Sequence, residues 1–194
     1  HTIGRRQRQM CIRDRLKAGK DPREVLKEIS DIFPFHASVS AEVVGDSVEE
    51  MLEMADDYIE IGPNITIKVP LTPEGLKVCK DLSTDDVAVN VTLCFSTAQA
   101  ILAAKAGATY VSPFVGRVND QSFDGIKLIE EISDVYATHK QKTQVLAASI
   151  RDVYQVASCF RVGADICTIP SKIFSGMYKH ILTDQGIAKF DEDW

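Results

Sequence analysis

The stretch from Asn64 to Pro70 reads N-I-T-I-K-V-P, and it decides how the rest of the chain is interpreted. Its alternating β-branched residues predict a strand that ends at Pro70. Because successive side chains of a strand point to opposite faces, Lys68 lies on the face opposite to Ile67 and Val69. Such a lysine either points into water at a sheet edge or is buried, which is costly for an ammonium group. A buried, neutral amine attacks carbonyl groups, so Lys68 is a candidate for Schiff-base formation.

The composition is that of an ordinary globular domain. Of 194 residues, 45% are hydrophobic and 26% are charged, and the formal net charge is −6. This acidic balance argues against nucleic acid as the main partner. No apolar run approaches the roughly 20 residues that cross a bilayer, and no signal peptide is visible, so we expect no membrane partner and a cytoplasmic location. The five cysteines contain no C-x-x-C pair, which favours reduced core thiols over a metal site.

The first eighteen residues differ from the remainder of the chain. Five arginines crowd into positions 5–15 of an otherwise acidic sequence, and no periodic apolar face accompanies them. We interpret residues 1–18 as a basic segment that is disordered or foreign, and we assign it no function. Residues 19–194 are expected to form a single domain.

From residue 21 onward, strand patterns and helix patterns alternate strictly. Hydrophobic spacing predicts strands over residues 35–44, 64–70, 87–93, 109–115, 145–150 and 166–169. It predicts helices over residues 21–32, 46–59, 72–82, 96–106, 124–139, 151–162, 172–178 and 183–190. This alternation is typical of parallel βαβ units.

Two architectures contain such units: the doubly wound open sheet and the (β/α)8 TIM barrel. Helices cover both faces of an open sheet, so both faces of its strands should be apolar. Here one face is apolar and the other carries Ser40, Glu42, Lys68, Asn90, Thr92, Ser112 and Ser149. No G-x-G-x-x-G turn supports a dinucleotide-binding sheet. We therefore predict an α/β fold, a TIM barrel of which six βα units are visible and the first two strands are lacking.

Polar residues near the strand ends form a coherent chemical set, because these ends share one mouth in a barrel. Lys68 is placed to attack a ketone, and Glu42 to move protons through a water molecule. Asn90 and Thr92 are placed to hold hydroxyl groups or that water. Glu42 is alternatively a simple salt-bridge partner of Lys68, and the amide and hydroxyl are alternatively satisfied core groups.

Two arginines follow later strands, where phosphate sites of such barrels tend to lie. Arg117 and Arg151, together with Ser112 and Ser149, suit a phosphate dianion, because guanidinium forks and hydroxyl groups match phosphate oxygens. Taken singly, each arginine is alternatively a solvated surface residue. Their joint presence with Lys68 at the same ends of several strands favours a sugar-phosphate site.

Seven motifs carry a family resemblance, and they extend from the predicted first strand to the last. They are S-A-E-V (40–43), I-K-V-P (67–70), N-V-T-L (90–93), F-S-T-A-Q-A (95–100), A-K-A-G-A-T-Y-V-S-P-F-V-G-R (104–117), A-A-S-I-R (147–151) and A-D-I-C-T-I-P (164–170). From about Ala37 to the end, the chain resembles the transaldolase family, in particular the small transaldolases related to fructose-6-phosphate aldolase.

The resemblance implies a class I aldolase barrel in which Lys68 forms a Schiff base with a ketose phosphate. A dihydroxyacetone unit is then transferred to an aldose phosphate, a step of the pentose phosphate pathway. Neither a cofactor nor a metal is implied; the partners are sugar phosphates and further copies of the chain in a homo-oligomer. The implied catalytic residues are Lys68, Glu42 and Thr92. The implied substrate-binding residues are Asn90, Ser112, Phe114, Arg117, Ser149 and Arg151.

Two positions separate the branches of the family. Glu42 and Phe114 resemble transaldolases, whereas the aldolase branch has Gln and Tyr there. The family also begins with a strand ending in Asp and a second strand with a T-T-N-P-S loop, and neither has a match in this sequence. Three hypotheses follow: a transaldolase, a fructose-6-phosphate aldolase that releases free dihydroxyacetone, or a catalytically impaired barrel fragment.

Overall fold

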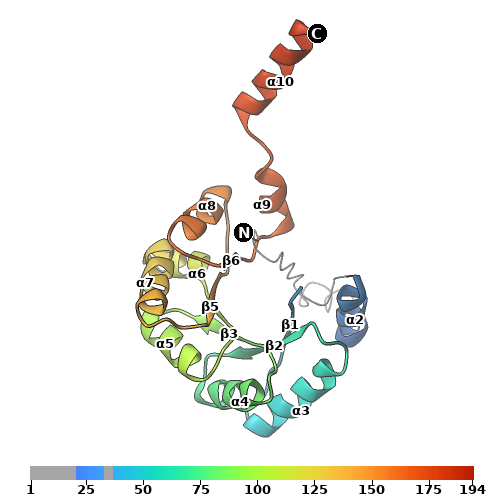
Figure 1. The fold of residues 1–194 in the computed structure, drawn as a ribbon, viewed down its shortest axis with the longest axis vertical. Helices are drawn as coiled ribbons and strands as arrows, with labels where there is room; N and C mark the ends of the chain where they lie inside the picture. Colours follow the sequence, from blue (N-terminus) through green and yellow to red (C-terminus); the bar gives the residue numbers. More distant parts are fainter. Residues whose placement is uncertain (1–20, 33–36) are drawn as a thin grey trace.

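The computed structural model describes residues 21–32 and 37–194 (Figure 1). The basic segment predicted over residues 1–18 lies outside the described residues. So does the beginning of the strand predicted over residues 35–44. In the described part of the chain, no helix is long and apolar enough to cross a membrane.

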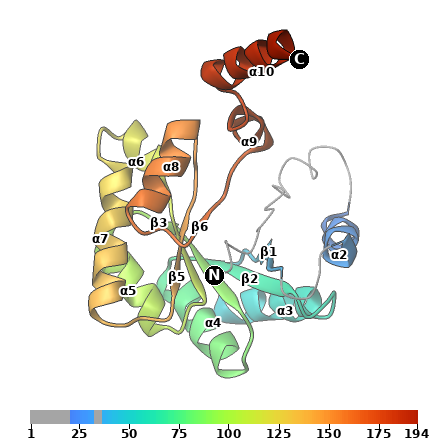
Figure 2. The same ribbon diagram turned by 45° about the horizontal axis from the view of Figure 1, so that its top comes forward.

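Six parallel strands form one sheet with the order β1-β2-β3-β4-β5-β6. They are β1 (Val39–Glu42), β2 (Ile65–Pro70), β3 (Val89–Cys94), β4 (Tyr110–Pro113), β5 (Gln144–Ala147) and β6 (Ile166–Cys167). The sheet curls, and the helices lie along its outer side (Figures 1 and 2). This arrangement confirms a partial (β/α)8 barrel, with six strands in the described residues where a closed barrel of this class has eight.

A helix follows each of the first five strands and leads into the next one. These are α3 (Val48–Ile59), α4 (Pro73–Thr84), α5 (Thr97–Lys105), α7 (Gly125–Thr138) and α8 (Val153–Arg161), while α2 (Pro22–Ile32) precedes β1. Each of the five begins after a residue whose side chain accepts a hydrogen bond from a backbone N–H of the first turn. These N-caps are Ser47, Thr72, Ser96, Asp124 and Asp152.

The core lies between the sheet and the outer helices. Ala41, Ile67, Val69, Val91 and Val111 alternate along their strands and are fully buried. Their alternation is the pattern that predicted an apolar outer face, and it is confirmed. Since the opposite side chains point into the barrel, the polar residues among them are enclosed by the curled sheet rather than covered by helices.

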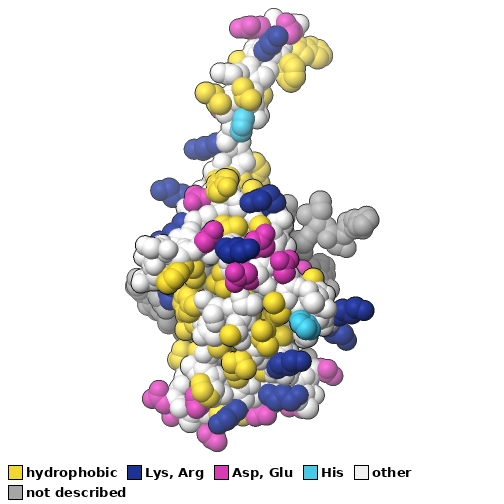
Figure 3. Space-filling view, turned by 90° about the vertical axis from the view of Figure 1, so that its left-hand side faces the viewer, with side chains coloured by type: hydrophobic (Ala, Val, Ile, Leu, Met, Phe, Trp, Pro, Cys, Tyr) yellow, Lys and Arg dark blue, Asp and Glu magenta, His cyan; other side chains and the backbone are white. Residues whose placement is uncertain are grey.

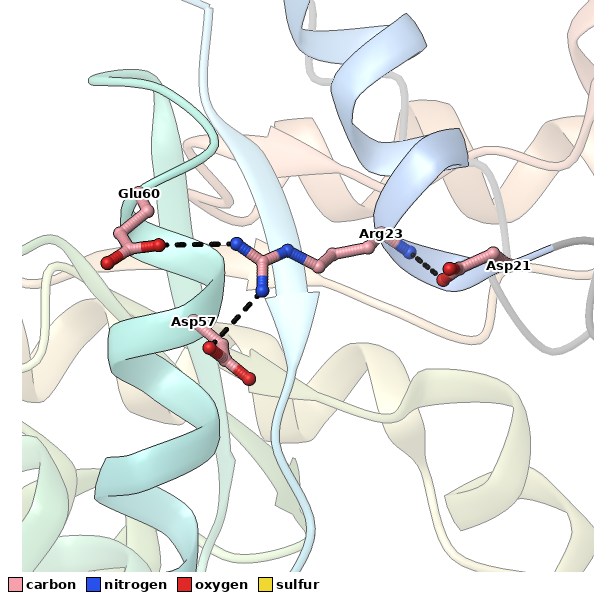
Figure 4. Close-up of polar contacts among 4 residues, drawn as sticks. All are labelled: Asp21, Arg23, Asp57 and Glu60. Atoms are coloured by element: carbon pink, nitrogen blue, oxygen red, sulfur yellow. Dashed lines mark hydrogen bonds and ion pairs between the residues drawn. The ribbon is translucent and has the colours of Figure 1, made fainter.

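An ion-pair cluster joins α2 to α3 on the surface (Figure 4). The guanidinium of Arg23 donates to Asp57 at 3.2 Å and to Glu60 at 3.3 Å, and the backbone N–H of Arg23 donates to Asp21. Exposed pairs of this kind are each worth about 0–1 kcal/mol. The buried side chain of Leu26, which is 1% exposed, therefore contributes more to holding α2.

The structure corrects the predicted end of the fourth strand. The strand predicted over residues 109–115 ends at Pro113, and Val115 begins a short helix, α6 (Val115–Asp120), that was not predicted. Phe114 makes only an isolated bridge to Ala148, so ladder pairing stops there. Six residues are fewer than two helical turns, which is too short for a hydrophobic period to show.

Two other strand ends deviate for a backbone reason. The strand predicted over residues 145–150 stops at Ala147, and Ser149 has a φ of +60°. Leu93 also has a φ of +60°, and the pairing of β3 with β4 shifts between Val91 and Cys94. This left-handed conformation is uncommon for residues other than glycine, and residues with this strain concentrate at functional sites.

The last two helices are α9 (Ser171–Gly176) and α10 (Ile181–Asp193). α10 begins two residues before the predicted helix and extends three residues beyond it. It projects away from the barrel as an arm (Figures 1 and 2), and none of its residues is buried. Its exposed apolar side chains are Ile181, Leu182, Ile187 and Phe190, with Trp194 directly after it.

Candidate active site

Lys68 lies in the interior of the sheet rather than at its edge, because β2 is paired with β1 and β3. Its side chain is 11% exposed, and its Nζ donates to Oε2 of Glu42 at 3.1 Å. Glu42 ends β1 and is directly in register with Lys68. The reading of Glu42 as a salt-bridge partner is therefore confirmed, and the same geometry keeps a proton acceptor beside the amine.

A buried hydrogen-bond network continues from this pair along the inner face of the sheet. Asn90 is in register with Lys68 on the next strand. Ser112 Oγ donates to Asn90 Oδ1 at 2.7 Å, and Asn90 Nδ2 donates to Ser40 Oγ at 3.4 Å. All three polar residues are buried, with Ser40 8%, Ser112 2% and Asn90 0% exposed. The network fixes the amide of Asn90 at the level of the Lys68 side chain.

Thr92 is the exception among these interior groups. It is fully buried, and its hydroxyl is one of two buried side-chain polar atoms in the described residues without a hydrogen-bond partner. Leaving a buried hydroxyl unsatisfied costs about 1–3 kcal/mol. The strained Leu93 follows it directly. An unsatisfied hydroxyl beside a strained residue is suited to hold a water molecule or a substrate hydroxyl.

A second group of residues gathers around α6, beyond the ends of β4 and β5. The guanidinium of Arg117 lies 4.9 Å from the centre of the Phe114 ring, within cation–π range. The ring of Phe95 packs edge-on against the Phe114 ring, with 5.7 Å between the two ring centres. Both terminal nitrogens of Arg151 donate to the two carboxylate oxygens of Asp120.

A backbone contact between Gly116 and Ser149 joins the first turn of α6 to the segment that follows β5. The carbonyl of Ser149 accepts a hydrogen bond from the N–H of Gly116 at 3.1 Å. A Cβ at position 116 would lie 2.3 Å from that carbonyl oxygen and 2.6 Å from Nε of Arg151. Only glycine therefore lets the first turn of α6 approach the end of β5 and the stem of Arg151 this closely.

An open groove of about 790 Å³ runs along this second group. Its walls are the start of α5, helix α6 and the start of α7. Its cationic side chains are Arg117, Lys127 and Arg151, and the rings of Phe95 and Phe123 line its apolar part. Asp120, Asp124 and Glu131 line the groove as well. Guanidinium groups beside aromatic rings suit an anionic ligand with an apolar or hydroxylated body.

The electrostatics differ between the groove and the core. The hydrogen bonds from Arg151 hold the pKa of the Asp120 carboxyl below its usual value, and the same contact raises the pKa of Arg151. In the core, burial raises the pKa of the Cys94 thiol to about 12. The four described cysteines, Cys79, Cys94, Cys159 and Cys167, are buried and free, as predicted for core thiols. No group of three or more potential metal ligands occurs among the described residues.

The sequence-based site is thus divided into an interior group around Lys68 and an arginine group at the groove. Ser112 and Phe114 connect the two groups, since they lie two residues apart at the end of β4. Ser112 belongs to the interior group through its hydrogen bond to Asn90, and Phe114 belongs to the arginine group through its contact with Arg117. Sequence reasoning missed Asp120 and Gly116 because it missed α6. The only signal was the glycine beside Arg117 in the motif S-P-F-V-G-R.

The curled parallel sheet, with a lysine–carboxylate pair on its inner face, is that of a partial (β/α)8 barrel. The sequence pattern of the family described as "Transaldolase/Fructose-6-phosphate aldolase" matches residues 12–194. A probable transaldolase of Paracoccus denitrificans (strain Pd 1222) is 51% identical over 179 residues, which cover 92% of this chain and 82% of the relative. A probable transaldolase of Clostridium kluyveri is 49% identical over 178 residues, with the same two coverages. The chain belongs to the transaldolase/fructose-6-phosphate aldolase family.

Proposed function

We propose that this chain is a transaldolase that works through a Schiff base on Lys68. The observation that carries the proposal is the Lys68 amine, largely buried inside the barrel and 3.1 Å from the carboxylate of Glu42. The relatives named as probable transaldolases support the reaction class. A cytoplasmic location and a role in the pentose phosphate pathway belong to the same proposal.

The reaction begins when Nζ of Lys68 attacks the ketone carbon of a ketose phosphate. Loss of water from the adduct gives the imine, and Glu42 transfers the protons that this step requires, through a water held at Thr92. The hydroxyl group on the fourth carbon then gives up its proton to Glu42 through the same water, the bond between the third and fourth carbons breaks, and an aldose phosphate leaves. The remaining dihydroxyacetone enamine adds to the aldehyde of an acceptor aldose phosphate, and hydrolysis of the imine restores Lys68.

The other site residues bind the sugar phosphate in this proposal. Asn90 and Ser112 hold hydroxyl groups of the bound ketose, because the Asn90 amide lies at the level of Lys68 and the Ser112 hydroxyl is hydrogen-bonded to it. The phosphate is bound by Arg117 and Arg151, which line the same groove, with Ser149 beside them. Phe114 supports Arg117 through the cation–π contact.

Trapping of the Schiff base tests the proposal. Incubation with fructose 6-phosphate and borohydride, followed by peptide mass spectrometry, should reveal a three-carbon adduct on Lys68. The variant Lys68→Met should show no adduct. The matched control is Lys127→Met, because Lys127 is an exposed lysine of the groove whose amine pairs with Glu130 at 2.7 Å. An adduct that persists in Lys68→Met, or its absence from the folded wild-type chain, would refute the proposed mechanism.

The aldolase activity is the second candidate, since the family description includes fructose-6-phosphate aldolase. An aldolase releases free dihydroxyacetone from fructose 6-phosphate without an acceptor. A transaldolase turns over only when erythrose 4-phosphate is present. A coupled assay with and without this acceptor distinguishes the two activities. A folded chain that binds phosphate without forming the adduct would instead support the catalytically impaired barrel.

We also propose that the chain self-associates through α10. An isolated helix shorter than about 12–15 residues is marginal in water, and α10 has 13 residues without a buried side chain. Ile187, Phe190 and Trp194 recur at helical spacing and are more than half exposed. Figure 3 shows apolar side chains on this arm and also on the outer face of the barrel. A second copy of the chain would supply the missing apolar contacts.

A further inference from the structure

Arg151 is already occupied by a carboxylate in this structure. Asp120 is the last residue of α6, and Arg151 follows the end of β5. Both terminal nitrogens of the guanidinium donate to both oxygens of Asp120, in the forked geometry that arginine also offers to a phosphate. Gly116 leaves room for Nε of Arg151 against the first turn of α6. A phosphate that binds Arg151 end-on must therefore displace Asp120.

The other acidic residues of the groove are engaged elsewhere. Asp124 caps α7 by accepting hydrogen bonds from two backbone N–H groups. Glu131 accepts a hydrogen bond from Thr97 at 3.1 Å. Within the residues that the structure describes, Arg117 has no ion-pair partner and rests on the Phe114 ring. Asp120 is thus the acidic residue of the groove that competes for a guanidinium.

We propose that Asp120 is a specificity-determining residue, a tethered carboxylate that competes with the substrate phosphate for Arg151. The proposal rests on the proposed binding of a sugar phosphate in the groove. The tether holds the carboxylate beside the guanidinium at a high effective concentration, so an anion that interacts weakly does not displace it. The pair is about half exposed, at 50% for Arg151 and 43% for Asp120, so an anion that interacts more strongly than the carboxylate displaces it. A dianion that contacts Arg117 and Arg151 together meets that requirement.

The proposal predicts a gain of binding on substitution. Asp120→Asn keeps the size of the side chain and removes its charge. The dissociation constant for inorganic phosphate should then fall about three- to tenfold at low ionic strength, because the competitor and its repulsion of a dianion are both lost. The gain should shrink as salt is added, since these groups are exposed and screened. The KM for fructose 6-phosphate should fall with little change in kcat.

Calorimetric titration of the full chain with inorganic phosphate tests the proposal directly. Asp124→Asn is the matched control, because it removes the same charge from the same groove without touching Arg151, and it should change binding less than twofold. In the Arg151→Gln background, Asp120→Asn should bring no further gain, since the competition requires the guanidinium. Melting temperatures within a few degrees of the wild type would show that each variant is folded.

Three results would overturn the proposal: weaker or equal phosphate binding by folded Asp120→Asn, an equal gain in Asp124→Asn, or a full gain in the Arg151→Gln background. The titration needs no catalysis, so it separates this inference from the proposed mechanism. If phosphate binding tightens as expected but no adduct forms on Lys68, the Schiff-base mechanism fails and the role of Asp120 stands. If the adduct forms on Lys68 but Asp120→Asn does not tighten phosphate binding, the Schiff-base mechanism stands and the proposed role of Asp120 fails.

Discussion

Two backbones approach closely near the groove where Gly116 contacts the carbonyl of Ser149, and Gly116→Ala perturbs this contact directly. The added Cβ would lie 2.3 Å from the carbonyl oxygen of Ser149, whereas ordinary contacts begin at 3.4 Å. It would also lie 2.6 Å from Nε of Arg151. Because the first obstacle is backbone, the end of β5 or the first turn of α6 must move by about 1 Å.

The expected cost has a stability part and a binding part. Overpacking by one methyl group costs about 1–3 kcal/mol of the free energy of unfolding, and the hydrogen bond from Gly116 to Ser149 is stretched as well. A displacement of about 1 Å at a binding group can lower activity about 100-fold. We therefore expect Gly116→Ala to remain folded, with a lower denaturation midpoint, and to lose most of its phosphate affinity and its borohydride trapping rate.

Urea denaturation and phosphate titration measure the two parts. The matched control is Gly186→Ala on α10, where an added Cβ has no neighbour within 4 Å among the described residues. This substitution should leave trapping unchanged and stabilise α10 slightly, since glycine is a poor residue inside a helix. Equal stability and equal phosphate affinity of Gly116→Ala and Gly186→Ala would refute the reasoning that α6 and β5 position Arg151 through this contact.

Three further predictions follow from single features of the structure. Thr92→Val should leave the free energy of unfolding unchanged or raise it by up to about 1–3 kcal/mol, because it removes an unsatisfied buried hydroxyl, yet it should slow Schiff-base trapping; a normal trapping rate would contradict the role of the hydroxyl. The free energy of unfolding should fall as pH rises above about 9, because burial raises the pKa of Cys79 and Cys94 from 9.0 to about 12 and also that of Tyr136. Each group binds its proton more tightly in the folded state, so each lowers the free energy of unfolding by about 1.4 kcal/mol per pH unit between its unfolded and folded pKa values. A free energy of unfolding that stays constant from about pH 9 to 10.5 in chemical denaturation would contradict this. Deletion of residues 181–194 should lower the molecular mass measured by light scattering to that of one chain, and an unchanged assembly would show that α10 is not the contact.

The hydrogen-bonding geometry separates structural from chemical roles in the interior group. Asn90 and Ser112 are satisfied by each other, so their substitution disturbs packing as well as chemistry. Lys68 and Glu42 form one pair, so substituting either one leaves the other without its partner. Thr92 alone has no partner to lose. For this reason Thr92→Val is the cleanest single test of a chemical role in the barrel interior.

Strand and helix alternation, the apolar outer face and the polar inner face were readable from the sequence alone. They depend on local periodicity, and residues such as Ile67 and Lys68 differ in face because a strand alternates by geometry. The family motifs contain Lys68, Glu42 and the two arginines, so these candidate site residues could also be predicted from the sequence. The pairing of Glu42 with Lys68 was predictable as an alternative, because both lie at the ends of neighbouring parallel strands.

Only the tertiary structure decided what surrounds the arginines. Asp120 and Arg151 are 31 positions apart, and the helix that brings them together has six residues, too few to leave a periodic signal. The close approach of Gly116 to Ser149 and the left-handed backbone of Leu93 and Ser149 arise from how strand ends meet α6, not from local propensity. Local pattern therefore determined the barrel and the two faces of its strands, whereas contacts between distant strand ends determined which side chains surround the arginines.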